Sequence, residues 1–338
     1  MKCPKCGAIS RPPSRYCEFD GTQLVQESLI EADDLTMMPP PIEVCSCGGI
    51  IAEDELCSTC GKARPTISHA FDRVEQAPAP ELAGLSDVGL RHQWNEDALS
   101  LAADVHDSQP VYVLVVCDGV SSARDSPFMA RLAADVTRDR LLQFTGNDPL
   151  EGVRQAILSA HRAICESRDP DPNRTVVRGK AQEPGCTIVA ARVHAGHATV
   201  GWVGDSRAYR LSGSGGVALT HDHSWFNDVV DSGAMTAEEA AHSPQRNAIT
   251  RCLGPLGVDG PGQDPQVDVV ACDVPSGEML LLCSDGLWKY AAEPADLARV
   301  AQSPSEGGLP LDISRHLVAY ANECGGTDNI TAAILKVP

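Results

Sequence analysis

Acidic residues at the ends of short apolar segments constrain the fold of this chain more than any other feature of its sequence. Four aspartates have this placement: Asp118 after VYVLVVC, Asp205 after TVGWVG, Asp285 after LLLCS, and Asp328 just before ITAAILKV. Short apolar segments rich in β-branched residues are typical of buried strands. A carboxylate at the end of such a strand leaves the core and enters a cleft. An adjacent glycine, present for three of the four, lets the backbone approach a ligand closely.

The rest of the chain after its N-terminal region alternates short strands with helices. Strands are predicted at 111–117, 187–194, 198–203, 207–211, 217–219, 267–272, 279–283 and 330–337. Helices are predicted at 127–144, 150–166, 294–301 and 311–322, with a short one starting at the capping box TAEE (236–239). Asp148-Pro149 marks the start of the second helix, and SGSGG (212–216) predicts a hairpin turn. Clustered strands with helices inserted predict antiparallel sheets in an α+β fold.

The net charge of −19 limits the classes of partner. An acidic surface repels phosphate backbones, so nucleic-acid binding is disfavoured. Hydrophobic residues make up 43% of the chain, yet no stretch of about 20 apolar residues is present to cross a membrane. The N-terminal sequence MKCPKCG lacks the apolar segment of a signal peptide. We therefore expect a cytoplasmic protein whose cysteines are thiols or metal ligands rather than disulfides.

Cysteine usage divides the chain of 338 residues into two regions. Seven of the 14 cysteines lie in the first 60 positions, and the other seven are scattered singly, as is typical of small core residues. The acidic, proline-rich stretch 27–41 and the Ala/Pro-rich stretch 76–80 are typical of linkers. We predict a small module at 1–65, a linker at 66–80 and one large domain at 81–338.

The N-terminal cysteines have the spacing of structural zinc sites. One set consists of two close pairs, each followed by glycine: Cys45, Cys47, Cys57 and Cys60. It suits a tetrahedral zinc site, the alternatives being a redox dithiol or free thiols. In the other set an aspartate takes the fourth position: Cys3, Cys6, Cys17 and Asp20. Carboxylate oxygen also ligates zinc, so we predict a site there too, the alternatives being an open three-cysteine site or no metal.

Together the two sets resemble tandem zinc ribbons that hold one or two structural Zn²⁺ ions. A module this small has too few apolar residues to fold without a metal. Zinc ribbons commonly bind proteins or nucleic acids, and the acidic composition favours a protein partner.

The strand-end carboxylates predict a second kind of metal site. Several converging carboxylates repel one another strongly unless cations lie between them. Oxygen-only ligation selects Mg²⁺ or Mn²⁺ over zinc or copper, and two such ions can activate a shared water and hold a phosphoryl group for in-line attack. A single Asp-Gly pair is more often a tight turn. Four such aspartates in this order, together with Asn95-Glu96-Asp97, favour the metal site.

Eight motifs occur in order along the large domain: DVGLRHQWNEDAL (87–99), VCDGVSS (116–122), GCTIVAA (185–191), GWVGDSRAYRL (201–211), THDHSW (220–225), NAITRCLG (247–254), LLCSDGLW (281–288) and GGTDNITAAIL (325–335). The sequence after residue 80 thereby resembles the metal-dependent protein phosphatases, the PPM or type 2C protein phosphatase family, in its bacterial form. The resemblance implies a four-layer α-β-β-α sandwich of two antiparallel sheets flanked by helices, with the metals at one end.

The resemblance also implies how the acidic residues share Mn²⁺ or Mg²⁺ ions. Asp118 would bridge two ions, and the carbonyl of Gly119 would complete the second. Asp285 and Asp328 would hold the first. Asp205, together with Asp285, would hold a third ion.

Two further implications concern the chemistry. Asp97 would bind the metal shell through water, with Asn329 in support. A hydroxide that bridges the metals would attack phosphorus directly, without a phosphoenzyme, so that the implied catalytic residues are Asp118, Asp285 and Asp328.

Two departures from the family pattern concern the substrate. Many members carry an arginine three residues before the asparagine of the NED motif, where it grips the substrate phosphate. Here that position is His92, and Arg91 is one residue early; either is a candidate, the alternative being two surface polar residues. VSS (120–122) follows the Asp-Gly step, so the histidine that eukaryotic members offer as a general acid is absent there. Leaving-group protonation is then unassigned, with metal-bound water as the candidate. We expect a structural role for His223, the alternative being an acid–base role.

The large domain therefore points to an enzyme. We predict a serine/threonine protein phosphatase whose substrates are phosphoproteins of a serine/threonine kinase, with zinc ribbons that recruit or regulate through a protein partner. The segment 220–253 corresponds to the flap that would help set substrate choice. The alternatives are a catalytically weak phosphatase-like scaffold or regulatory binding protein, and a zinc-ribbon nucleic-acid binder with an accessory domain.

Overall fold

Two antiparallel sheets form the centre of the large domain. The computed structural model describes residues 72–92, 94–120, 126–167, 184–213, 215–255, 263–302 and 308–337. One sheet has the strand order β1-β2-β11-β10-β7-β8 and the other has the order β3-β4-β5-β6-β9, and all neighbouring strands are antiparallel. The strands are Arg73–Ala79 (β1), Leu82–Asp87 (β2), Asp97–His106 (β3), Gln109–Asp118 (β4), Ile188–His194 (β5), His197–Val203 (β6), Arg207–Ser212 (β7), Gly215–Ala218 (β8), Asp268–Asp273 (β9), Met279–Cys283 (β10) and Ile330–Lys336 (β11).

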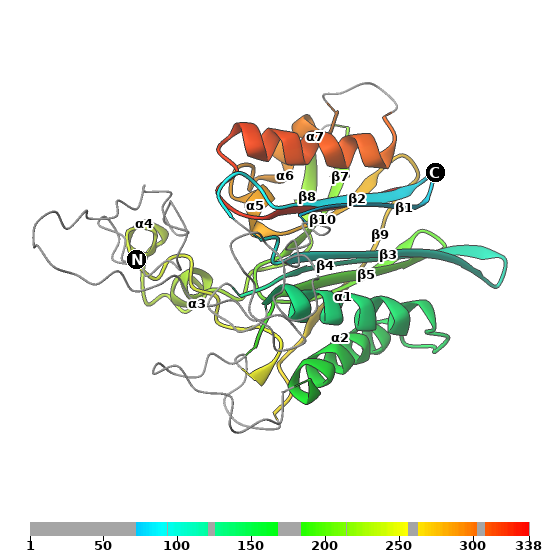
Figure 1. Cartoon of the computed structure of the whole chain (residues 1–338), viewed down its shortest axis with the longest axis horizontal. Coiled ribbons are helices and arrows are strands. Elements are labelled where there is room, and N and C mark those ends of the chain that lie inside the picture. Colours follow the sequence, from blue (N-terminus) through cyan, green and yellow to red (C-terminus); the bar gives the residue numbers. More distant parts are fainter. Residues whose placement is uncertain are drawn as a thin grey trace, which may run out of the picture.

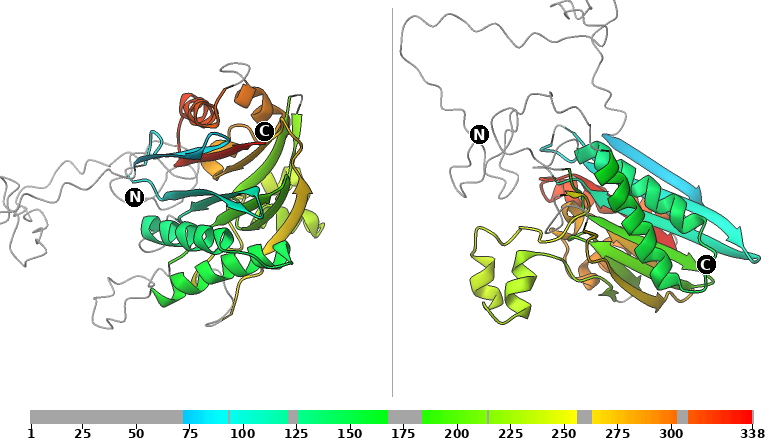
Figure 2. Two further views of the ribbon diagram at one scale, coloured as in Figure 1. Left: turned by 90° about the vertical axis from the view of Figure 1, so that its right-hand side faces the viewer. Right: turned by 90° about the horizontal axis from the view of Figure 1, so that it is seen from below.

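Helices cover the outer face of each sheet, which gives four layers in the order α-β-β-α (Figures 1 and 2). The helices are Ser126–Leu142 (α1), Pro149–Glu166 (α2), Trp225–Asp231 (α3), Ala237–Ala241 (α4), Asp285–Trp288 (α5), Pro294–Gln302 (α6) and Pro310–Glu323 (α7). α5, α6 and α7 lie on the first sheet, and α1 and α2 lie on the second. The predicted α+β sandwich is therefore confirmed. Among the helices of the described ranges, none has the length and apolar character needed to cross a bilayer.

Apolar cores between the layers explain why residues 111–117 of β4 include no charged residue. Successive residues of a strand face opposite sides of its sheet. In β4, Val113 and Val115 pack toward α1 and α2, whereas Leu114 and Val116 pack between the two sheets. A third core lies between the first sheet and α6 and α7. β4 is buried on both faces, so its sequence is a continuous apolar run rather than an alternating one.

Local signals in the sequence place several elements correctly. Asp148 caps α2 by accepting a hydrogen bond from the backbone N–H three residues on, and Pro149 occupies the first turn. Thr236 and Glu239 form the predicted reciprocal capping box at the start of α4. The predicted hairpin at the glycine-rich segment joins β7 to β8. These elements were predictable because each start signal is made by neighbouring residues.

The linker predicted at 66–80 is wrong in its second half, because residues 73–79 form β1. Arg73 lies opposite Asp87 of β2, and its guanidinium donates to that carboxylate at 2.7 Å. β1 is an edge strand with a register shift, and edges and bulges are where a sheet tolerates proline. The Ala/Pro-rich composition therefore belongs to a strand, and the large domain begins before residue 81. β2 and β3 were not predicted from the sequence.

The strand ends that carry the acidic residues lie at one end of the sandwich. β4 ends at Asp118, and β11 starts two residues after Asp328. β10 ends at Cys283, and Ser284 then leads into α5, whose first residue is Asp285. α3 and α4 project from this end, while the turn between β3 and β4 projects from the opposite end (Figure 1). The aspartates therefore lie at one end of the sandwich, and the β3–β4 hairpin turn lies at the other.

Replacing Leu114 by alanine should destabilise the domain strongly. Leu114 is completely buried between the sheets, so truncation leaves a cavity and loses apolar burial. We expect the free energy of unfolding, measured by urea denaturation, to fall by about 2–5 kcal/mol. In the control Val105→Ala, the residue is 65% exposed near the end of β3, and the change should stay within about 0.5 kcal/mol. Equal unfolding midpoints for the two variants would contradict the assigned core.

Candidate active site

Five aspartates come together at the end of the sandwich from which α3 and α4 project. Asp97 starts β3 and Asp118 ends β4, and the two are paired residues of adjacent strands. Asp285 is the first residue of α5, Asp328 precedes β11, and Asp205 lies in the turn between β6 and β7. The charges of the other four all act on Asp118. Both sheets therefore contribute to a single acidic cluster.

Two hydroxyl groups hold the Asp97 carboxyl on one side only. Ser284 Oγ and Thr331 Oγ1 each donate a hydrogen bond of 2.7 Å to Asp97 Oδ2, whereas Asp97 Oδ1 is buried without a partner. Burial, with the nearby charges of Asp328 and Asp285, raises the pKa of Asp97 to about 7 despite these hydrogen bonds. Neither hydroxyl residue was predicted from the sequence, because an isolated serine or threonine has no spacing that marks it.

Burial also raises the pKa of three other carboxyl groups of the cluster, those of Asp118, Asp205 and Asp285. Burial, followed by the charge of Asp97, raises the pKa of Asp118, and burial also raises that of Asp285. Burial raises the pKa of Asp205 to about 8, with Asp285 adding to the effect. Asp285 Oδ1, like Asp97 Oδ1, is buried without a hydrogen-bond partner. A buried, unsatisfied oxygen is costly, and converging carboxylates favour a hard cation. This donor set therefore fits Mg²⁺ or Mn²⁺.

The carboxylates are gathered without forming a closed coordination shell. In the part of the chain that the structure describes, no three histidine, cysteine, aspartate or glutamate side chains are close enough to ligate one ion. Like charges repel, so a cation is needed to draw such side chains together. The predicted cluster of Asp97, Asp118, Asp205, Asp285 and Asp328 is present, and the role of each residue as a ligand stays a prediction.

Two glycines allow the backbone to pass closely at this end. A Cβ atom on Gly286 would collide with the carbonyl oxygen of Asn329. A Cβ atom on Gly119 would lie 2.8 Å from the carbonyl oxygen of Glu96 and 2.8 Å from Cβ of Ser126. Each Asp-Gly step of the cluster therefore needs its glycine for steric reasons. The Gly119 carbonyl as a metal ligand remains a prediction.

Asn329 fixes the loop that leads into β3. Its Oδ1 accepts a hydrogen bond of 2.8 Å from Glu96 N, and its Nδ2 donates to the carbonyl oxygens of Val88 and Trp94. Ser126 Oγ, at the start of α1, donates to Glu96 Oε1. Asn329 therefore holds the backbone on either side of the loop, and its support of the metal shell stays a prediction.

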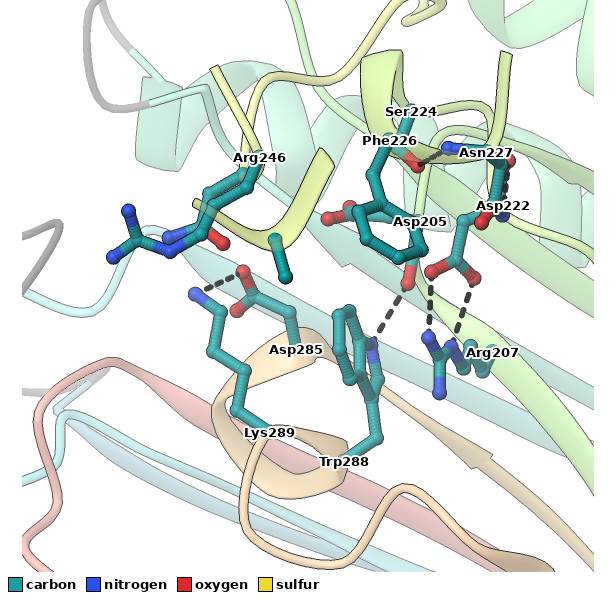
Figure 3. A pocket seen from close by; sticks show the side chains of 12 residues that line it. Asp205, Arg207, Asp222, Ser224, Phe226, Asn227, Arg246, Asp285, Trp288 and Lys289 are labelled. Atoms are coloured by element: carbon teal, nitrogen blue, oxygen red, sulfur yellow. Dashed lines mark hydrogen bonds and ion pairs between the residues drawn. The ribbon is translucent and has the colours of Figure 1, made fainter. Parts of the chain in front are cut away.

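Lys289 is a residue of the site that the sequence analysis missed. Its Nζ lies 2.5 Å from Asp285 Oδ2 and 3.2 Å from Asp328 Oδ2, and Figure 3 draws the first of these ion pairs. Burial lowers the pKa of Lys289, but the adjacent carboxylates raise it by more, to well above its usual value. The one signal in the sequence for this contact is that Lys289 follows Asp285 by four residues, a spacing at which two side chains of a helix are neighbours. A protein cation thus contacts two of the predicted metal ligands.

The two candidates for binding substrate phosphate lie on the loop between β2 and β3. His92 Nε2 is 3.3 Å from Asp328 Oδ1, and 10% of the His92 side chain is exposed. Arg91 is exposed. The structure therefore places His92 against the acidic cluster and Arg91 at the surface. Assignment of either one to the phosphate stays a prediction.

A cavity of about 280 Å³ adjoins the cluster on the side of α3 and α4 (Figure 3). Its lining includes Asp205, Phe226, Arg246, Asp285, Trp288 and Lys289. Acidic, basic and aromatic side chains thus face one space, and part of the predicted flap, 220–253, forms its wall. The cavity is large enough to receive a side chain next to the carboxylates.

A network around Arg207 ties this wall to α5. The Arg207 guanidinium donates to both carboxylate oxygens of Asp222, at 2.8 and 2.7 Å, and lies 3.7 Å from the centre of the Trp288 ring (Figure 3). Trp288 Nε1 donates to the carbonyl oxygen of Asp205 at 2.8 Å. Bidentate pairing and stacking on an aromatic ring are geometries that arginine provides and lysine does not. The network therefore fixes Asp205 relative to α5.

His223 has the contacts of a structural residue. Its Nδ1 accepts a hydrogen bond of 3.1 Å from Gly204 N, its Nε2 lies 3.0 Å from Asp268 Oδ2, and its ring stacks on Trp202. Only 5% of His223 is exposed. It holds the turn that carries Asp205, which agrees with the role predicted for it.

The predicted zinc ligands lie outside the described residues. They are Cys3, Cys6, Cys17, Asp20, Cys45, Cys47, Cys57 and Cys60.

Comparison with known proteins places the site in a family. The family model of protein phosphatase 2C matches residues 90–307. The serine/threonine phosphatase stp of Listeria innocua is 27% identical over 255 residues, which cover 74% of this chain and 93% of that protein. The solved serine/threonine phosphatase of S. agalactiae is 26% identical with a TM-score of 0.60, covering 76% of this chain and 99% of that chain.

A further solved structure shares the fold. The catalytic domain of the serine/threonine protein phosphatase PstP, solved in complex with two manganese ions, is 23% identical with a TM-score of 0.56. The match covers 75% of this chain and 96% of that chain, and the manganese ions belong to that protein. The region that the family model matches is more than half of the chain and holds every aspartate of the cluster except Asp328. The chain belongs to the protein phosphatase 2C family.

Proposed function

We propose that this chain is a metal-dependent phosphatase that hydrolyses phosphoserine and phosphothreonine in proteins. Family membership makes it a serine/threonine protein phosphatase of the 2C type, and the Listeria innocua relative carries that activity in its name. The observation that carries the metal-dependent mechanism is the acidic cluster with its two orphaned oxygens, Asp97 Oδ1 and Asp285 Oδ1. Its substrates are, in this proposal, phosphoproteins made by a serine/threonine kinase.

Two divalent cations, Mn²⁺ or Mg²⁺, fit the donor set. In the proposal Asp118, the Gly119 carbonyl, Asp285 and Asp328 would hold the two ions, and Asp97 would act through water. Such ions lower the pKa of a water molecule and neutralise charge on a phosphoryl group. Carboxylate and carbonyl oxygens are the ligands that these hard cations prefer.

The chain's own residues orient this donor set and the substrate. Ser284 and Thr331 hold Asp97 Oδ2, which leaves Asp97 Oδ1 buried without a partner and, in the proposal, available to the metal centre. His92, against Asp328, is the residue we assign to the substrate phosphate, with Arg91 as a second contact from the surface. A low-dielectric, partly buried site strengthens each of these electrostatic contacts.

The cavity beside the cluster is our candidate for the residues that flank the phosphorylated side chain. Phe226 and Trp288 offer apolar surface there, and Arg246 offers a positive charge. Because Phe226 and Arg246 come from the segment 220–253, changes in that segment should alter which phosphoproteins are preferred.

The N-terminal module is proposed to bind one or two structural zinc ions and to contact a protein partner. The proposal rests on cysteine spacing alone. We keep the module at 1–65 and place the start of the phosphatase domain at β1 rather than at residue 81, because β1 pairs with β2.

A catalytically weak scaffold is the second candidate function. One observation favours it: Lys289 is paired with two of the proposed ligands, Asp285 and Asp328. A protein cation at that position lowers the demand for a metal ion. Activity of the full chain separates the two candidates.

The full chain should hydrolyse a phosphothreonine peptide in the presence of Mn²⁺ and lose this activity with a chelator. Asp118→Asn and Asp285→Asn should each lower kcat/KM by about 100-fold or more, because metal ions supply several kcal/mol of transition-state stabilisation. Phosphate release measured against Mn²⁺ concentration checks both effects.

Asp107→Asn is the matched control for these variants. It makes the same chemical change at an exposed residue in the turn between β3 and β4, with a φ of 51° that asparagine tolerates. Its activity should equal that of the wild type. Activity that survives chelation, or full activity in Asp118→Asn, is incompatible with the mechanism, and absence of turnover under any divalent metal favours the scaffold.

Elemental analysis of the purified full chain should find one or two zinc ions per molecule. Cys57→Ala should lose one of them, because a four-ligand site deprived of one thiolate binds zinc much more weakly. The control Cys324→Ala removes an exposed free cysteine far along the sequence from the N-terminal module. It should keep the wild-type zinc content. Wild-type protein without zinc would refute the zinc-ribbon proposal.

A further inference from the structure

Asp205 and Asp285 form a pair of acids that needs a positive charge. Both line the cavity beside the cluster, and the charge of Asp285 raises the pKa of Asp205. The family resemblance assigns this pair to a third metal ion. Lys289 lines the same cavity, and its charge lowers the pKa of Asp205 (Figure 3). A cation that belongs to the chain therefore contacts Asp285 directly and acts on Asp205 through its charge from the same cavity.

The fold of α5 directs Lys289 to this position. The backbone N–H of Lys289 donates to the carbonyl oxygen of Asp285 at 3.0 Å, so the two residues lie one helical turn apart on the same face. Trp288, the preceding residue, is fixed by its stacking against Arg207 and by its hydrogen bond to the backbone of Asp205. The Lys289 side chain remains 31% exposed, so attraction to the carboxylates rather than close packing holds it there.

The ammonium group of Lys289 contacts one oxygen of Asp285 and leaves the other available for the two-ion centre. Lys289 Nζ contacts Oδ2 of Asp285 and Oδ2 of Asp328. Asp285 Oδ1 stays buried without a partner, like Asp97 Oδ1. The unsatisfied oxygens thus remain for the two-ion centre, whereas a third ion between Asp285 and Asp205 would meet an ammonium group already bound to Asp285. The ammonium group and a third metal ion, both positive and both next to Asp285, would repel each other strongly in a partly buried site.

We propose that Lys289 is the resident cation of the Asp205–Asp285 pair, so that the phosphatase domain binds two divalent ions and excludes a third. This inference rests on the two-ion centre of the proposed function. It changes the role of Asp205 from a metal ligand to an acid that faces the same cavity as Lys289, and it gives the enzyme a fixed positive charge that does not depend on metal concentration.

Counting bound Mn²⁺ tests the proposal without reference to activity. The full chain is titrated with Mn²⁺ alone, and free Mn²⁺ is measured by electron paramagnetic resonance. Lys289→Gln removes the charge and should bind one ion more than the wild type. Lys289→Arg keeps the charge and should bind the wild-type number. Ions held elsewhere in the chain cancel, because only the difference between variants is used.

Lys336→Gln is the matched control, because it makes the same charge change at the end of β11. It should leave the Mn²⁺ count unchanged. An equal count for wild type and Lys289→Gln, a lower count for Lys289→Gln, or an added ion in Lys336→Gln overturns the inference alone. If the wild type and all three variants bind no Mn²⁺, the two-ion centre of the proposed function fails, and the inference fails with it.

Discussion

Repulsion among the aspartates at one end of the sandwich is the interaction on which the rest of the site depends. Folding brings five carboxyl groups together and buries them in part, and both effects raise the pKa of Asp97, Asp118, Asp205 and Asp285. The chain compensates incompletely. Two hydroxyl groups hold one oxygen of Asp97, and Lys289 contacts Asp285 and Asp328, while two oxygens stay buried without partners. The unbalanced charge is what makes the site a candidate for divalent cations.

The pairing and packing of the strands keep these carboxyl groups together despite their repulsion. β4 is buried on both faces and ends at Asp118, and its pairing with β3 sets Asp97 opposite it. On the first sheet, β10 leads into α5 and β11 follows Asp328, so the same packing positions Asp285 and Asp328. Apolar burial along the strands therefore offsets the electrostatic cost at their ends. This is why a site of unfavourable charge is placed at the edge of a well-packed core.

Sequence reasoning succeeds where a signal is local or belongs to one buried element. β4 and β10 are predictable from continuous apolar runs, and α2 and α4 from their caps. β1 is misread as a linker because its proline and alanine are typical of one, although an edge strand tolerates both. β3 and β2 are missed because their polar positions face the site or pair across the sheet, which no local pattern reveals.

The sequence by itself determined the family, the ordered aspartates and the strands that end at them, because these depend on residue type and spacing along the chain. Only the tertiary structure decided which groups surround each carboxylate. Thr331 of β11 and Ser284, which follows β10, both donate to Asp97 of the other sheet. Lys289, which follows α5, contacts Asp328, which precedes β11. Such contacts join residues far apart in sequence, so their effect on charge follows from the packing of the layers and has no counterpart in a motif.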